Sequence, residues 1–86
     1  MSTGLRRFWY PLAGYLGVGV TALTETDARA LAEAARARCW PKAPPVNEVI
    51  CDVDIQNLDQ KHVVPNMEAP NWAGVWYPRG FAKSNA

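Results

Sequence analysis

The sequence predicts a small α+β fold, a mostly antiparallel sheet of β-β-α-β-β order with one amphipathic helix packed on one face. Two observations carry this prediction. Short apolar runs lie before and after one long segment with helical periodicity, and turn-forming prolines and glycines separate them. The 86 residues are expected to form a single domain, 1–86, with flexible ends at about 1–5 and 82–86.

A β-hairpin is predicted near the N-terminus. Its strands are the runs Arg6–Tyr10 and Tyr15–Ala22, and the turn-rich residues 11–14 between them suit a short antiparallel connection. The second run alternates larger apolar residues with glycines, in the order Leu16, Gly17, Val18, Gly19 and Val20. One face of this strand is therefore expected to meet the helix, while the other face has almost no side chains.

The helix is predicted over residues 25–39. Thr24 is a favourable N-cap, and Asp27 three positions later gives an approximate capping box. The buried stripe consists of small or apolar residues at helical spacing: Ala28, Leu31, Ala32, Ala35 and Cys39. The opposite face is charged and is expected to meet solvent: Arg29, Glu33 and Arg36.

Three strand candidates follow the helix: Val46–Ile55, His62–Val64 and Trp72–Tyr77. The first alternates, and its core-facing residues are expected to be Val49, Cys51, Val53 and Ile55. Both cysteines of the chain are therefore expected to be reduced, buried and inert. The tripeptide Trp-Tyr-Pro occurs in the first and the last candidate strand, and pairing of these two strands would place Trp9 beside Trp76.

The composition argues against several classes of partner. The net charge is +1, from nine Lys and Arg against eight Asp and Glu, and no basic block concentrates the positive charge as nucleic-acid binding requires. No apolar run approaches the roughly 20 residues that span a membrane, and no signal peptide is recognisable. A soluble cytoplasmic protein without a nucleic-acid, membrane or cofactor partner is therefore expected.

A single helix leaves one face of the predicted sheet uncovered. That face and its rim form the predicted binding surface, which consists of Trp9, Trp76, Met67, Trp72, Asp52 and Asp54. The two strand tryptophans have an alternative role, because they would also fit against each other and against Gly17 and Gly19 inside the protein's own core.

Three functions fit this surface. The leading hypothesis is a non-enzymatic interaction module that binds itself, as a homodimer or larger oligomer, or binds a protein partner. The alternative is a binding protein for a cationic or flat aromatic small molecule, held by indole rings and carboxylates. A third hypothesis is a metal-assisted hydrolase that uses Asp52, Asp54 and His62. No motif of high specificity assigns a catalytic, cofactor-binding or metal-ligating residue.

Overall fold

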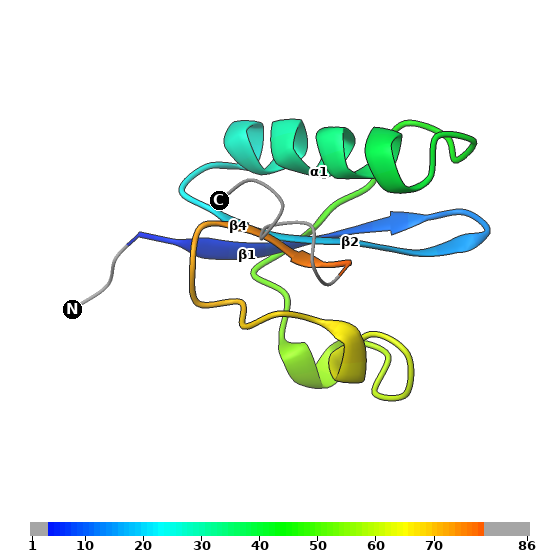
Figure 1. The fold of residues 1–86 in the computed structure, drawn as a ribbon. Coiled ribbons are helices and arrows are strands. Elements are labelled where there is room, and N and C mark those ends of the chain that lie inside the picture. Colours follow the sequence, from blue (N-terminus) through cyan, green and yellow to red (C-terminus); the bar gives the residue numbers. More distant parts are fainter. Residues whose placement is uncertain (1–3, 79–86) are drawn as a thin grey trace.

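The computed structural model describes residues 4–78, which form a four-stranded antiparallel sheet between two covering layers (Figure 1). The elements are β1 (Arg6–Leu12), β2 (Tyr15–Ala22), α1 (Glu25–Cys39), β3 (Ile50–Cys51), the short 3-10 helices η1 (Ile55–Asn57) and η2 (Val64–Asn66), and β4 (Gly74–Tyr77). The strand order is β3-β1-β2-β4. The predicted α+β class and element order are confirmed. The expected flexible ends lie outside the described residues, apart from positions 4 and 5.

Strands β1 and β2 form the predicted hairpin, but their pairing contains an irregularity. Pro11 lies opposite Gly17 and Leu12 lies opposite Tyr15, so Leu16 is an extra residue on β2. Such a β-bulge interrupts the alternation of side chains between the two faces. Leu16 therefore does not join the valines of β2 beneath the helix and is 40% exposed. The prediction that it faces the helix is wrong.

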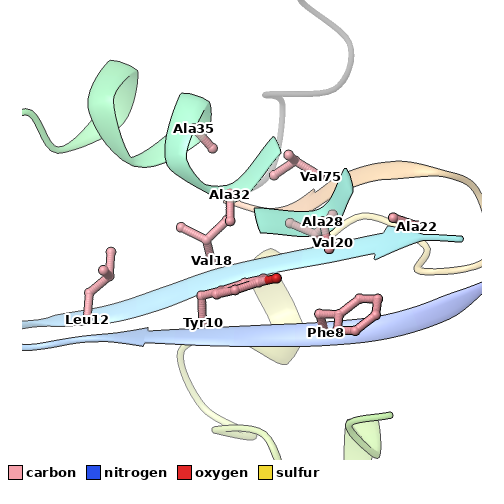
Figure 2. Packing of buried hydrophobic residues seen from close by; sticks show 10 residues of the cluster. All are labelled: Phe8, Tyr10, Leu12, Val18, Val20, Ala22, Ala28, Ala32, Ala35 and Val75. Atoms are coloured by element: carbon pink, nitrogen blue, oxygen red, sulfur yellow. The ribbon is translucent and has the colours of Figure 1, made fainter. Parts of the chain in front are cut away.

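Helix α1 covers one face of the sheet, with the predicted bounds and N-cap. The Thr24 hydroxyl accepts a hydrogen bond from the Asp27 N–H at 3.2 Å. Figure 2 shows the helix alanines directed at the apolar side chains of the three longer strands. This helix-side core consists of Phe8, Tyr10, Leu12, Val18, Val20, Ala22, Ala28, Ala32, Ala35 and Val75. Small alanines allow close packing of helix and sheet, since no long side chain separates them.

The charged face of α1 is not wholly solvated, contrary to the prediction. Arg36 is only 8% exposed, forms an ion pair with Glu33, and donates from Nη1 to the Ala43 carbonyl at 2.8 Å. Glu33 also accepts from the Val46 N–H at 3.1 Å. The chain that leaves the helix runs back beside it, so charged side chains satisfy backbone groups that no strand pairs. Cys39 at the end of the predicted buried stripe is exposed.

The segment after the helix contains much less strand than predicted. Only Ile50 and Cys51 pair with β1, opposite Trp9 and Phe8. Asp52 has φ 55°, a left-handed conformation that ends the alternation, although the Val53 N–H still donates to the Arg7 carbonyl of β1 at 3.2 Å. Cys51 is consequently exposed rather than buried. The predicted strand at residues 62–64 is also wrong, because His62 and Val63 lie in a turn and Val64 begins η2.

The face of the sheet opposite α1 is covered by the chain between β3 and β4, which Figure 1 shows as the green-to-yellow layer below the sheet. This layer and the sheet share a second core, which consists of Trp9, Val53, Leu58, Val63, Trp76 and Tyr77. The expectation of an uncovered face is therefore wrong. Apolar residues in irregular structure cover it, and they show no strand or helix periodicity in the sequence. No helix within residues 4–78 is long and apolar enough to cross a membrane.

Candidate functional site

The indole rings of Trp9 and Trp76 stack in the second core, with ring centroids 6.0 Å apart and an interplanar angle of 26°. Their exposed fractions are 7% and 1%. A Cβ on Gly17 would lie 2.7 Å from the Trp9 ring, and a Cβ on Gly19 would lie 2.4 Å from the Trp76 ring. The two tryptophans therefore have the alternative role: they pack on each other and on these glycines inside the protein's own core. The strands themselves do not pair as predicted, because β2 lies between β1 and β4.

A pocket of about 410 Å³ opens beside Trp9, where the layer below the sheet meets the edge strand β3. We call it the Trp9 pocket. Its apolar lining consists of Trp9, Leu16, Ile50, Val53, Leu58 and Val63. The bulge of β2 brings Leu16 to this side of the sheet, and the pairing of Ile50 with Trp9 brings the isoleucine there. Both aliphatic side chains keep much of their surface in water, since Leu16 is 40% and Ile50 50% exposed.

Three carboxylates also line the Trp9 pocket: Asp52, Asp54 and Asp59. Asp52 is held in a bidentate ion pair, in which Arg6 Nε and Nη2 donate to its two oxygens at 2.9 and 2.8 Å. The Arg6 guanidinium holds the pKa of the Asp52 carboxyl below its ordinary value. Within the described residues, the pocket lining contains no lysine, arginine or histidine. Asn57 adds a neutral polar group, and the charged residues of the lining are therefore all anionic.

Asp54 and Asp59 stabilise the turns around the pocket. Asp54 caps η1 by accepting from the Gln56 N–H at 2.9 Å. Asp59 Oδ1 accepts from the N–H groups of Lys61 and His62 at 2.8 and 2.9 Å, and Oδ2 lies 3.2 Å from His62 Nδ1. The backbone hydrogen bonds from His62 and Lys61 hold the pKa of Asp59 below its ordinary value. These short-range bonds fix the two carboxylates at the pocket rim.

The two loop residues of the predicted binding surface lie in different environments. Met67 is partly buried against the second core. Trp72 is 76% exposed, in the turn before β4, and does not line the Trp9 pocket. The predicted surface is thus divided between the buried Trp9 and Trp76 pair, the pocket carboxylates and a separate exposed indole.

The residues of the hydrolase hypothesis are not brought together as a metal site. Within residues 4–78 no group of three or more His, Cys, Asp or Glu side chains is placed to hold a metal ion. Asp52 is paired with Arg6, while the exposed His62 lies against Asp59. The described residues therefore give no support to a metal-assisted hydrolase.

The alternation along residues 46–55 places Ile50 on the same side as Asp52 and Asp54, but the sequence pattern did not indicate Leu16 as a site residue. The signal that was present is the glycine that follows Leu16 within a strand, because an isolated strand glycine is typical of a β-bulge. Gly17 has φ 144°, which that bulge requires. Recognition of the bulge would have moved Leu16 to the opposite face.

Comparison of the chain with protein-family models, with curated proteins and with solved structures finds no match. The chain's own residues therefore carry the functional argument. They provide an anionic pocket with an apolar lining and, apart from it, an exposed indole at Trp72.

Proposed function

We propose that this chain is a non-enzymatic binding module and that the Trp9 pocket is its site for a small molecule. The observation that carries the proposal is the pocket itself, whose volume of about 410 Å³ lies in the range of ligand sites, about 300–1,000 Å³. A mainly apolar lining with a few converging polar groups is the usual composition of such sites.

The exposed apolar rim supports this proposal. Leu16 and Ile50 are 40% and 50% exposed although both line the pocket. A ligand that covered them would gain about 25 cal/mol for each Å² of apolar surface removed from water. The carboxylates beside this rim favour the cationic ligand of the alternative hypothesis over an anionic one.

The test is a titration of the ¹⁵N-labelled protein with a small panel of cationic, neutral and anionic aromatic fragments. Fragments that enter the pocket are expected to shift the indole N–H signal of Trp9 and the backbone amides of Ile50, Val53 and Leu58. Leu16→Trp would place a larger side chain over the cavity and is expected to weaken those shifts strongly. Shifts confined to other parts of the chain would contradict the proposal.

The matched control for this variant is Leu23→Trp. Leu23 is 58% exposed and does not line the pocket. The same change of residue type at this position is expected to leave fragment binding as it is in the unaltered protein. Equal loss of binding in both variants would show that the effect of Leu16→Trp is not local to the pocket.

A protein partner, including a second copy of this chain, is the second candidate function, and the exposure of Trp72 favours it. The loop before this indole is anchored, since the Thr21 hydroxyl donates to the Pro70 carbonyl at 2.7 Å and the Glu68 N–H donates to the Trp76 carbonyl at 2.7 Å. Tryptophan is enriched among residues that dominate binding energy at protein interfaces. The exposure of Trp72 supports a contact at this residue rather than at Trp9 and Trp76, which are buried.

Sedimentation velocity of the unaltered protein and of Trp72→Ala tests this second candidate. A homodimer that depends on Trp72 is expected to dissociate at least thirtyfold more readily in the variant, since truncation of a central interfacial tryptophan costs about 2 kcal/mol or more. A dimer of unchanged affinity in the variant would contradict a contact centred on this residue.

For cellular location we propose the cytoplasm, a reducing compartment, because both cysteines are free.

A further inference from the structure

We infer that the Trp9 pocket selects a primary ammonium compound with an apolar body, and that Asp54 holds the ammonium group. This inference rests on the proposed binding function and specifies its ligand class. Two observations support it: the hydrogen bonds that the three pocket carboxylates already accept within the protein, and the small exposed fraction of the Trp9 side chain.

Two of the three carboxylates are satisfied inside the protein. Both oxygens of Asp52 accept from Arg6, so its charge is neutralised by an ion pair. Both oxygens of Asp59 are also engaged, one by two backbone N–H groups and the other by the ring of His62. A ligand cation at either carboxylate would compete with partners that are already in place.

Asp54 differs from these two. Its Oδ1 accepts from the Gln56 N–H, and its Oδ2 accepts no hydrogen bond from any residue within 4–78. Asp54 lines the pocket and is exposed. It therefore offers a fixed carboxylate oxygen to an incoming donor without the loss of an internal bond. A charge-assisted hydrogen bond from an ammonium N–H is the strongest contact available to that oxygen.

The aromatic ring of the pocket cannot replace that hydrogen bond. Trp9 is 7% exposed because its ring lies on Gly17, stacks with Trp76 and contacts Tyr77 at a centroid distance of 5.7 Å. Cation–π attraction requires the cation over an open ring face. A quaternary ammonium, which has no N–H to donate, would have neither contact. The pocket is therefore expected to prefer a primary ammonium to its trimethylated analogue.

The exposed aliphatic side chains define the rest of the ligand. Leu16 and Ile50 border the same cavity as Asp54, so an apolar group attached to the ammonium can cover them while the nitrogen reaches the carboxylate. The inferred ligand class is thus an aryl- or alkylamine, and the anionic lining opposes a carboxylate in its place.

The experiment compares four probes that share a phenethyl body: phenethylamine, its N,N,N-trimethyl derivative, 2-phenylethanol and 3-phenylpropanoate. Binding is followed by the Trp9 indole N–H signal and the amides of the pocket, at constant ionic strength. Phenethylamine is expected to bind more tightly than the trimethyl and neutral probes, by up to about fivefold, the upper range for one exposed charge pair, and 3-phenylpropanoate is expected to bind most weakly.

Asp54→Asn tests the anchor. Asparagine still accepts the cap bond from Gln56, so the turn is expected to persist while the charge is lost. Asp27→Asn is the matched control, since it removes the same charge from the exposed first turn of α1, outside the pocket. Asp54→Asn is expected to remove the preference for phenethylamine over 2-phenylethanol, and Asp27→Asn to retain it.

The outcomes separate the two proposals. If the neutral and cationic probes bind the pocket equally, the pocket is a binding site and the inferred ligand class is wrong. If phenethylamine is preferred but Asp54→Asn binds it as before, the anchor is wrong. If none of the four probes shifts the pocket signals, both this inference and the proposed function fail.

Discussion

The indole rings of Trp9 and Trp76 stack on each other although their strands are not neighbours in the sheet. Strand β2 separates β1 from β4, and the residues of β2 beneath the two rings are Gly17 and Gly19. Because glycine has no side chain, both rings can lie over β2 and meet above it. The glycines thereby allow the aromatic core that lies opposite the helix.

Gly19→Ala is expected to destabilise the protein by about 1–3 kcal/mol, the usual cost of overpacking a core. The added Cβ would lie 2.4 Å from the Trp76 ring, which is closer than side chains tolerate. Chemical denaturation gives the free energy of unfolding. In combination with Trp76→Phe, which makes room for the methyl group, the two changes are expected to cost less together than the sum of the single costs. Strict additivity would contradict a direct clash.

The two tryptophans of the C-terminal half are expected to differ sharply in their contribution to stability. Trp76→Ala should cost about 3–5 kcal/mol, because it leaves a large cavity in the second core. Trp72→Ala should change the free energy of unfolding by no more than about 0.5 kcal/mol, since this indole is 76% exposed. Denaturation of the isolated monomers is the measurement, and similar costs at both positions would be inconsistent with the structure.

The N-cap of α1 is expected to contribute to the stability of the protein. Thr24→Ala removes the acceptor for the Asp27 N–H and is expected to cost about 0.5–2 kcal/mol. Thr24→Ser keeps a hydroxyl at the same position, so it should retain most of the stability. A variant series in which serine and alanine are equally destabilising would show that the lost stability comes from the threonine methyl group rather than from the cap.

The sequence was sufficient to predict those elements whose structure is determined by local signals. The helix has its predicted bounds because the cap residue and the alanine stripe agree with each other. The hairpin was predictable for the same reason. The stacking partner of Trp9 was also identified correctly, although through a strand pairing that does not occur.

The rest of the fold depends on tertiary contacts that leave no periodic pattern. Val53 alternates with its neighbours as a strand residue would, yet the turn at Asp52 sends it into the core opposite α1. Leu58 and Val63 lie in irregular chain and cover the tryptophans without regular spacing. The candidate site was the hardest part to predict from the sequence, since the Trp9 pocket is formed by this irregular chain and by the β-bulge at Leu16.

The exposure of both cysteines reverses the expectation that they are inert core residues. In the native protein both thiols are expected to react with a thiol reagent without prior unfolding, as single-cysteine variants Cys39→Ser and Cys51→Ser would show. Partial burial raises the pKa of the Cys39 thiol, so its labelling at neutral pH should be slower than that of an unhindered model thiol. Labelling only after addition of denaturant would contradict the exposed positions.

The ion pair of Glu33 with Arg36 makes the attachment of the 43–46 connector dependent on pH. The hydrogen bond from Arg36 chiefly lowers the pKa of the Glu33 carboxyl, partial burial opposes this effect, and the Val46 N–H assists it. The folded protein therefore binds this proton less readily than the unfolded chain. The stabilising contribution is fully present above the ordinary pKa of 4.5 and is lost as the pH falls through the lower pKa of the folded state.

Glu33→Gln is therefore expected to be less stable than the unaltered protein at pH 7, and the difference should shrink towards zero on acidification. Glutamine can still accept from the Val46 N–H, so the variant tests the charge and leaves Arg36 nearly buried without its anionic partner. Glu48→Gln is the control, since Glu48 forms no ion pair with any residue of the described chain. Free energies of unfolding measured from pH 7 to pH 3 give the two difference curves. A Glu33→Gln difference that stays constant over this range would show that the carboxylate charge does not hold the connector.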